Sequence, residues 1–372
     1  MTISHNSEGC FDHLNNSNRP KRNFILRSFS IETNKGILLI LASVTLFLAV
    51  FGGAYIKWAQ SSNPPELRLS RTSSQPSPTL QTVQTDAIEA ITISAGILND
   101  FYVLTKDKIL YYHLLDSPRG ELQIRKRFEI ELDKRPTASC FVMRPDSYFH
   151  EKLFIAFANS ISLFDPESMT LSHYIQFEPE SNITGLATDG YDLYAADSGL
   201  GIFYRIDRGN AVSSWGIPDE KTGFQGFSKN RYSFFDLDIS QKNETIYVTH
   251  PDKYRIEAFS ALDGHWKKEE SFEKSPTDDN DQGETFTGVS NPASIIILGD
   301  GSFLTTDSGP EPGVKSWHPD GSFQAEILLP EINTPIAADQ APLVTVTFTE
   351  SRRGRLLILM PTGMLVSLTA SP

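Results

Sequence analysis

Short apolar runs alternate with polar turns along most of the chain, from residue 79 to residue 372. The runs have the length of strands and are rich in Ile, Leu, Phe, Tyr and Val. They are separated by Gly, Asp, Asn, Ser and Pro. Long stretches with the 3.6-residue period of an amphipathic helix do not occur in this region. The pattern therefore predicts an all-β domain over residues 79–372.

One order of elements recurs six times: a turn, a strand, a short loop and a second strand. The strand that follows each turn ends at an equivalent position, at intervals of about 40–57 residues. These positions are Thr105, Phe157, Asp197, His250, Asp307 and Met360. Repeats of this length with three or four short strands each are typical of propeller blades. Runs such as SIIIL, residues 294–298, suit a sheet that is covered on both faces. The predicted fold class is an all-β, six-bladed β-propeller.

The sixth repeat offers three strands before the sequence ends at Pro372. A propeller ring needs its first and last blades fastened together. The segment Thr79–Gln84, TLQTVQ, alternates as a strand does. We expect this segment to supply the outer strand of the sixth blade and thereby to close the ring.

An uncharged apolar segment precedes the propeller region. Residues 36–56 are long enough to cross the ~30 Å hydrocarbon core of a bilayer as a helix. The sequence thus predicts a disordered cytoplasmic tail at 1–35, a transmembrane signal-anchor helix at 36–56 and a Ser/Thr/Pro-rich tether at 57–78. Basic residues gather before the segment, so the N-terminus is expected in the cytoplasm and the propeller in the periplasm or outside the cell. The alternative is a cleaved signal peptide, whose apolar region is usually shorter, about 7–15 residues.

The third, fourth and fifth repeats resemble the blades of NHL-repeat propellers. The residues that carry the resemblance are Gly185, Leu186, Ala187, Asp189, Leu193, Tyr194, Ala196 and Asp197 in the third repeat, Ile246, Tyr247, Val248, Arg255, Ile256 and Phe259 in the fourth, and Pro292, Ile295, Gly301 and Asp307 in the fifth. The first, second and sixth repeats lack the Asp and Arg of the pattern. The resemblance implies a six-bladed propeller and no particular activity.

Asp197, His250 and Asp307 occupy the same position in three successive repeats. Their side chains are candidates to converge at one mouth of the axial channel, where a His and two carboxylates can bind a divalent metal ion. No other cofactor is indicated. The alternative is that each side chain caps the turn that it begins, as Asp does in Asx turns. The residues at the other three equivalent positions, Thr105, Phe157 and Met360, argue against a complete ring of ligands.

Charge and composition narrow the function classes. The net charge of −13 argues against nucleic acid as a partner, and the two cysteines cannot define a disulfide framework. The charged run Lys267–Glu284 reads as a solvated loop, with a contact for a basic partner or calcium as the alternative. Residues 182–184 and 243–245 are N-glycosylation sequons, which matter only in a host that glycosylates secreted chains.

Two functional hypotheses follow. The first is a membrane-anchored module that binds or scaffolds a partner protein, since loops on a rigid scaffold are common recognition surfaces. The second is an extracytoplasmic lactonase- or esterase-like hydrolase, or a lyase, with a metal site at the channel mouth. Residues 290–309 faintly resemble the Asn-Gly and Asp-Ser signatures of such propeller hydrolases.

Overall fold

A computed structural model of the chain describes residues 79–116, 122–229, 235–250, 253, 255–272, 292–307, 313–327, 329, 341–348 and 354–369. The chain divides into two units, Met1–Gln60 and Ser61–Pro372, and every described residue belongs to the second. The predicted tail, anchor helix and tether lie outside the described residues, as does most of the charged run after Phe272. Within the described ranges, no helix combines the length and the apolar composition needed to span a membrane.

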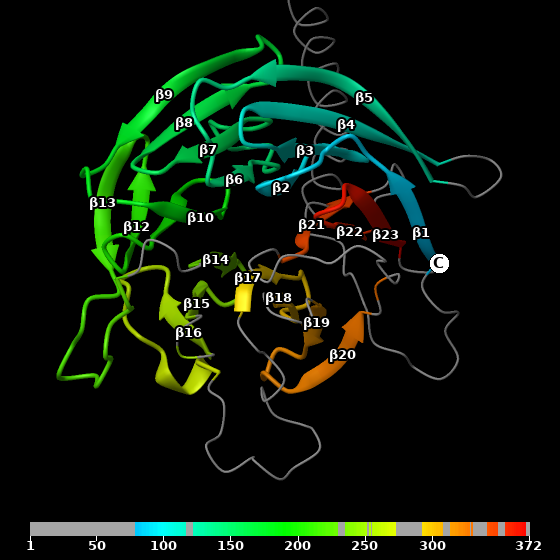
Figure 1. The fold of residues 1–372 in the computed structure, drawn as a ribbon. Helices are drawn as coiled ribbons and strands as arrows, with labels where there is room; N and C mark the ends of the chain where they lie inside the picture. The colour runs from blue at the N-terminus through cyan, green and yellow to red at the C-terminus, as the bar shows by residue number, and fades with distance from the viewer. Residues whose placement is uncertain are drawn as a thin grey trace, which may run out of the picture. The chain divides into compact units, whose positions relative to one another are not determined.

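Six antiparallel sheets stand around a common centre and form a six-bladed β-propeller (Figure 1). Blade 1 consists of β2 (Thr92–Ala95), β3 (Asp100–Leu104), β4 (Lys108–Asp116) and β5 (Leu122–Glu131). Blade 2 consists of β6 (Ala138–Phe141), β7 (Leu153–Phe157), β8 (Ser160–Asp165) and β9 (Thr170–Gln176). Blade 3 consists of β10 (Ile183–Thr188), β11 (Leu193–Asp197), β12 (Ile202–Asp207) and β13 (Asn210–Trp215).

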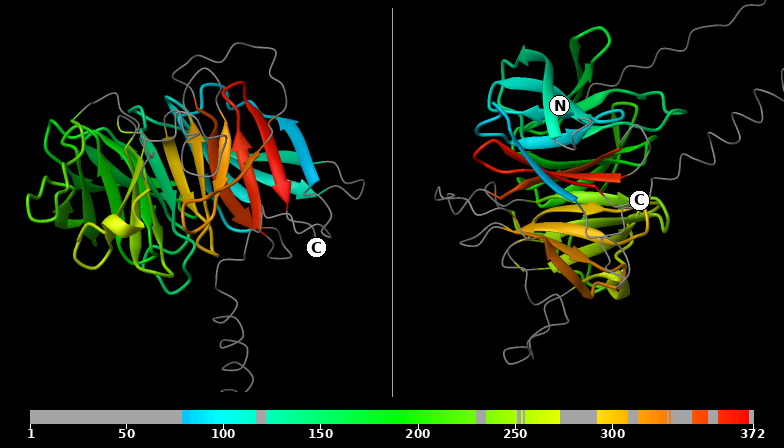
Figure 2. Two further views of the ribbon diagram at one scale, coloured as in Figure 1. Left: turned by 90° about the horizontal axis from the view of Figure 1, so that it is seen from below. Right: turned by 90° about the vertical axis from the view of Figure 1, so that its right-hand side faces the viewer.

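The second half of the ring follows the same plan (Figure 2). Blade 4 has three named strands, β14 (Leu237–Ser240), β15 (Thr245–His250) and β16 (Arg255–Ser260), followed by the short 3-10 helix η2 (Lys268–Glu270). Blade 5 consists of β17 (Pro292–Ile297), β18 (Phe303–Asp307), β19 (Val314–Trp317) and β20 (Phe323–Ile327). Blade 6 consists of β21 (Leu343–Phe348), β22 (Gly354–Leu359), β23 (Met364–Thr369) and the early strand β1 (Thr79–Gln84).

The six strands predicted to follow the turns are the second strands of the six blades: β3, β7, β11, β15, β18 and β22. In blades 1 to 5 the first strand lies innermost and the later strands follow outward in chain order. In blade 6 the order outward is β21, β22 and β23, and the early strand β1 is outermost. The predicted fold class and blade number are therefore confirmed.

The ring is closed by pairing between the beginning and the end of the described chain. Strand β1 pairs antiparallel with β23 over its whole length, from Thr79 opposite Thr369 to Gln84 opposite Met364. The backbone contact continues one residue further, where Thr85 N donates to Gly363 O at 2.9 Å. This confirms the predicted closing strand.

The hydrophobic core is divided into one cluster between each pair of neighbouring blades. Alternation along the second strands explains this division, because successive side chains point to opposite faces. In β11, Leu193 and Ala195 pack toward blade 2, whereas Tyr194 and Ala196 pack toward blade 4. In the same way, alternate residues of β22 contribute to the clusters shared with blades 5 and 1. Each blade therefore buries both of its faces against its neighbours.

The closing strand predicts a matched pair of substitutions. Val83 packs against the cluster between blades 6 and 1, whereas the adjacent Thr82 is exposed. Val83→Asp places a carboxylate against apolar atoms, so we expect it to cost about 2 kcal/mol and about 4–8 °C of melting temperature. Thr82→Asp should change the melting temperature by no more than about 1 °C. Equal effects of the two variants, measured by thermal unfolding, would contradict closure through this strand.

Candidate functional site

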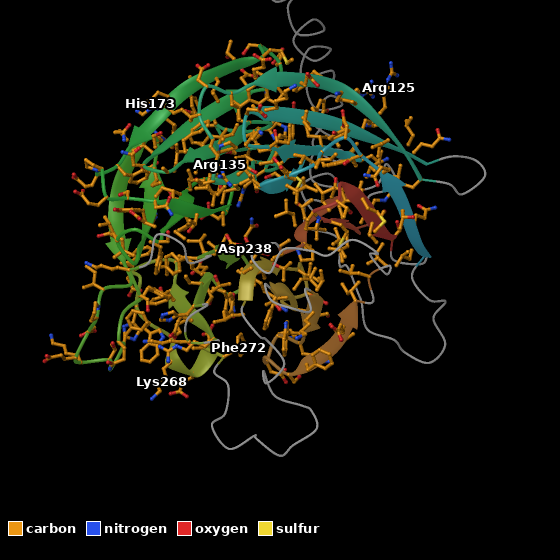
Figure 3. All side chains as sticks on the ribbon, in the orientation of Figure 1. Arg125, Arg135, His173, Asp238, Lys268 and Phe272 are labelled. Carbon is orange, nitrogen blue, oxygen red and sulfur yellow. The ribbon has the colours of Figure 1, made fainter. Side chains whose placement is uncertain are left out.

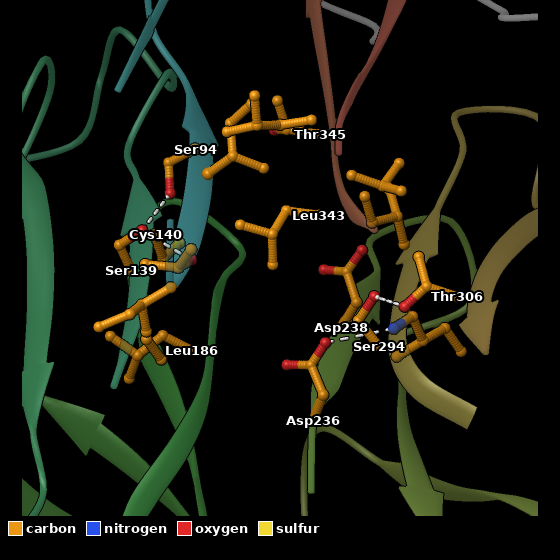
Figure 4. A pocket seen from close by; sticks show the side chains of 18 of the residues that line it. Ser94, Ser139, Cys140, Leu186, Asp236, Asp238, Ser294, Thr306, Leu343 and Thr345 are labelled. Carbon is orange, nitrogen blue, oxygen red and sulfur yellow. Dashed lines mark hydrogen bonds between the residues drawn. The ribbon is translucent and has the colours of Figure 1, made fainter. Parts of the chain in front are cut away.

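The innermost strands of all six blades line a cavity of about 970 Å³ on the axis of the ring. Residues of β2, β6, β10, β14, β17 and β21 all contribute to its wall (Figure 4). The cavity therefore belongs to the propeller as a whole, because no single blade could form it.

Two aspartates project into this cavity from blade 4. Asp236 directly precedes β14 and Asp238 lies within it, so their i, i+2 spacing puts both side chains on one face of the strand. Leu237 and Ile239 point the other way and join the cluster between blades 3 and 4. Figure 3 shows Asp238 at the inner rim, and Figure 4 shows both carboxylates facing the open centre.

The two carboxylates also connect blade 4 to blade 5. Ile295 N donates to Asp236 Oδ2 at 3.2 Å, and Ile297 N donates to Asp238 Oδ2 at 2.7 Å. An innermost strand has one edge without a partner strand, and its free N–H groups need acceptors. The aspartates supply these acceptors for β17. Gly185 in blade 3 leaves room for Asp236, since a Cβ there would lie 2.5 Å from Asp236 Oδ1.

The surroundings of the two aspartates oppose ionisation. Burial raises the pKa of Asp236 to about 7. The backbone N–H groups that donate to its carboxylate lower this pKa, whereas the charge of the nearby Asp238 raises it. Burial raises the pKa of Asp238 to about 6. Desolvation disfavours a charged carboxylate, and neither side chain has a basic partner on the described inner strands. Both groups thus change their charge close to neutral pH.

The wall across the cavity carries small polar groups and apolar side chains. Ser94 Oγ and Ser139 Oγ are 2.7 Å apart and share a hydrogen bond between blades 1 and 2. Cys140 also lines the cavity, and burial, together with the charges of the two aspartates, raises the pKa of its thiol. Leu186 and Leu343 add apolar surface. The site thus combines two carboxylates with hydroxyl and hydrocarbon walls.

Asp197, a candidate from the sequence, caps the turn after β11. Its Oδ1 accepts hydrogen bonds from Asn182 N at 2.8 Å, Gly199 N at 3.0 Å and Leu200 N at 3.1 Å. The side chain is fully buried and does not line the cavity. The capping role that the sequence offered as an alternative is therefore present, and a ligand role for Asp197 stays a prediction.

His250, the second candidate, is buried within blade 4. Its ring lies 5.0 Å from the ring of Phe227, and its Nδ1 is 3.8 Å from Glu257 Oε1. Burial lowers the pKa of His250, although Glu257 opposes this shift. Glu257 itself accepts a hydrogen bond from Trp266 Nε1 at 2.9 Å and pairs with Arg255. His250 thus contacts neighbours in its own blade and in the loop that precedes it.

Asp307, the third candidate, is the last residue of β18, and its backbone pairs with Pro292. Its side chain lies outside the described residues. No group of three His, Cys, Asp or Glu side chains placed to hold a metal ion is found in the described part of the chain. A common site for the three candidates therefore stays a prediction.

Sequence reasoning did not single out Asp236 and Asp238, although a signal was present. The other innermost strands read TISA, ASCF, ITGLAT, PASIII and LVTVTF, with small, hydroxyl or apolar residues at the positions that face the axis. Only the fourth repeat places Asp residues in this strand among these sequences, in the stretch DLDIS. A comparison of the first strands of the repeats would have found the pair.

Comparison with known proteins supports the fold. No protein-family model matches the chain, and no curated protein matches it. A streptogramin B lyase structure superposes with a TM-score of 0.50 at 11% identity, covering 79% of this chain and 98% of the lyase chain. A structural genomics protein of unknown function from Bacteroides thetaiotaomicron gives a TM-score of 0.52 at 12% identity, covering 79% of this chain and 76% of that one. At these identities the likeness concerns the fold alone.

The raised pKa values predict a pH-dependent stability. Asp236 holds its proton more tightly in the folded protein than at the reference pKa of 3.8, so the folded state loses stability as the pH rises from about 4 to about 7. Asp236→Asn keeps an oxygen acceptor for Ile295 N and removes the charge. The pKa difference corresponds to about 4 kcal/mol, so we expect this variant to be more stable than the wild type by up to this amount at pH 8, a gain that shrinks toward pH 4.

Thermal unfolding at pH 4.5 and pH 8 measures this difference. Asp219→Asn is the control, because Asp219 is exposed and hydrogen bonding to Lys221 N lowers its pKa. This control should show no gain in stability at pH 8. A gain for Asp236→Asn that is the same at both pH values would show that ionisation is not its cause.

Proposed function

We propose that the chain is a membrane-anchored extracytoplasmic β-propeller that acts as a binding module, and that its central cavity receives the ligand. The observation that carries the proposal is the pair of carboxylates on the wall of a cavity of about 970 Å³. Binding sites are usually preformed concave spaces with a few polar groups on a largely apolar wall. The axial cavity is preformed and concave, and it combines two carboxylates and several hydroxyl groups with apolar side chains.

The cost of the two desolvated carboxylates also favours a binding function. Two desolvated carboxylates without a basic neighbour on the inner strands reduce the stability of the free protein. Ionisable groups with perturbed pKa values inside a cleft are frequent at functional sites. A ligand that compensates their charge would recover the lost stability on binding.

The remaining parts of the proposal come from the sequence. The segment 36–56 is the proposed anchor, with the N-terminus in the cytoplasm and the propeller in the periplasm or outside the cell. The partner is proposed to be a protein, which would present a side chain or bound group to the cavity. Membership of the NHL-repeat propellers is proposed on the motifs of the third to fifth repeats.

A lyase- or hydrolase-like enzyme is the second candidate. The observation in its favour is the fold shared with a streptogramin B lyase, together with carboxylates whose pKa values of about 7 and about 6 suit proton transfer near neutrality. A divalent metal at Asp197, His250 and Asp307 belongs to this candidate. Elemental analysis of the full chain tests it. Stoichiometric metal that is lost in Asp197→Ala or Asp307→Ala without unfolding would favour the enzyme.

Filling the cavity tests the binding module. Leu343 lines the cavity, whereas Leu171 lies exposed on the outer strand of blade 2. A library of small neutral and charged fragments is screened against the full chain in nanodiscs by ligand-observed NMR. Fragments that bind the wild type should lose at least tenfold in affinity for Leu343→Trp, because the indole occupies the cavity, and should bind Leu171→Trp unchanged. Binding that tolerates Leu343→Trp would place the ligand site elsewhere.

A further inference from the structure

We propose that the group received by the central cavity is a cation, an ammonium or guanidinium on an apolar stem, held by the carboxylates of Asp236 and Asp238. This inference rests on the proposed binding function and adds the chemical class of the ligand. It is carried by three observations: the charge of the wall, the spacing of the two carboxylates and the nature of the facing surfaces.

The wall of the cavity has an uncompensated negative charge. Among the described residues that line it, the basic side chains are Lys106 and Arg135, which are exposed and lie in loops rather than on the inner strands. Lys106 lies 3.9 Å from Glu89, which also lines the cavity. No described basic group therefore stands beside Asp236 and Asp238. A buried carboxylate without an opposite charge is costly, and a cationic ligand removes this cost.

The spacing of the aspartates suits a single cationic group. The Cα atoms of residues i and i+2 in a strand are about 7 Å apart. Two hydrogen bonds of about 2.8 Å on opposite sides of one ammonium or guanidinium span a comparable distance. Each aspartate uses Oδ2 for an N–H of β17, and these hydrogen bonds fix both carboxylates at the rim. The site is therefore organised before the ligand arrives.

The facing surfaces suit the rest of such a ligand. Leu186 and Leu343 offer hydrocarbon contact to an apolar stem, as the stems of Lys and Arg find in proteins. The hydroxyls of Ser94 and Ser139 add neutral oxygen acceptors across the cavity. An anionic ligand would meet the two carboxylates without a described basic group beside them. The wall thus favours cationic ligands over anionic ones.

The same chemistry could come from a free amine or from a lysine side chain of the partner protein. Three probes of equal length separate charge from shape: n-pentylamine, 1-pentanol and pentanoate. A fourth probe, the capped peptide Gly-Lys-Gly, presents the ammonium on a peptide. Binding to the full chain in nanodiscs is measured at pH 8 by ligand-observed NMR titration, for the wild type, the double variant Asp236→Asn/Asp238→Asn and the surface control Asp219→Asn.

We expect n-pentylamine or the peptide to bind the wild type at least tenfold more tightly than 1-pentanol or pentanoate. The double variant should lose at least tenfold in affinity for the cationic probe, while Asp219→Asn should bind as the wild type does. The asparagine side chains keep oxygen acceptors for β17, and near-ultraviolet circular dichroism verifies that the variant is folded. The tighter of the two cationic probes identifies the source of the group.

Equal affinity for n-pentylamine and 1-pentanol, unchanged affinity of the double variant, or no binding of either cationic probe up to 10 mM (about −2.7 kcal/mol) would each overturn the inference. These results would leave the binding function intact if neutral or anionic fragments still bind the wild type and lose affinity for Leu343→Trp. If no fragment responds to Leu343→Trp, the binding function itself fails.

Discussion

The structure depends on the requirement that every blade bury both of its apolar faces against its neighbours. Alternate residues of one strand, such as Leu193 and Tyr194 in β11, belong to different clusters on the two sides of the sheet. An open stack of such sheets would expose one face at each end, and only a closed ring removes both ends. The antiparallel pairing of β1 with β23 joins strands from the two ends of the described chain. It also brings Val83 against the hydrophobic cluster between blades 6 and 1.

Closure also determines what can lie at the centre. Six innermost strands converge, and each has an edge that needs partners for its backbone groups. At two other junctions hydroxyl side chains meet this need: Ala95 N donates to Thr345 Oγ1 at 3.0 Å, and Thr184 Oγ1 donates to Phe235 O at 2.6 Å. Between blades 4 and 5 the same task is done by two carboxylates. Neutral side chains accept such hydrogen bonds without the cost of a desolvated charge, so the use of Asp at this place calls for a second role beyond the scaffold.

The sequence predicted the ring better than its centre. Turn residues and fully apolar runs recur in each blade, so the second strands and the closing strand were visible as local patterns. The innermost strands are short, and their weak patterns contain small residues. In a linear sequence, DLDIS resembles a polar turn as much as a strand. Its carboxylates become neighbours of a cavity only when six distant segments meet on one axis. The equivalence of Asp197 and His250 was correctly located at the ends of second strands, but backbone position alone did not reveal that Asp197 turns into its own loop and His250 into its own blade.

The start of the closing strand has a consequence for proteolysis of the chain. The six residue pairs of β1 and β23 run from Thr79 to Gln84, so a protease that cuts the chain before Thr79 leaves the closing strand inside the C-terminal fragment. The C-terminal fragment left by such a cut would keep an intact ring. A cut a few residues later, within β1, would instead remove part of the closing strand and expose apolar side chains of blade 6 to water. Cleavage before Thr79 thus preserves the propeller, whereas cleavage within β1 removes part of the strand that closes it.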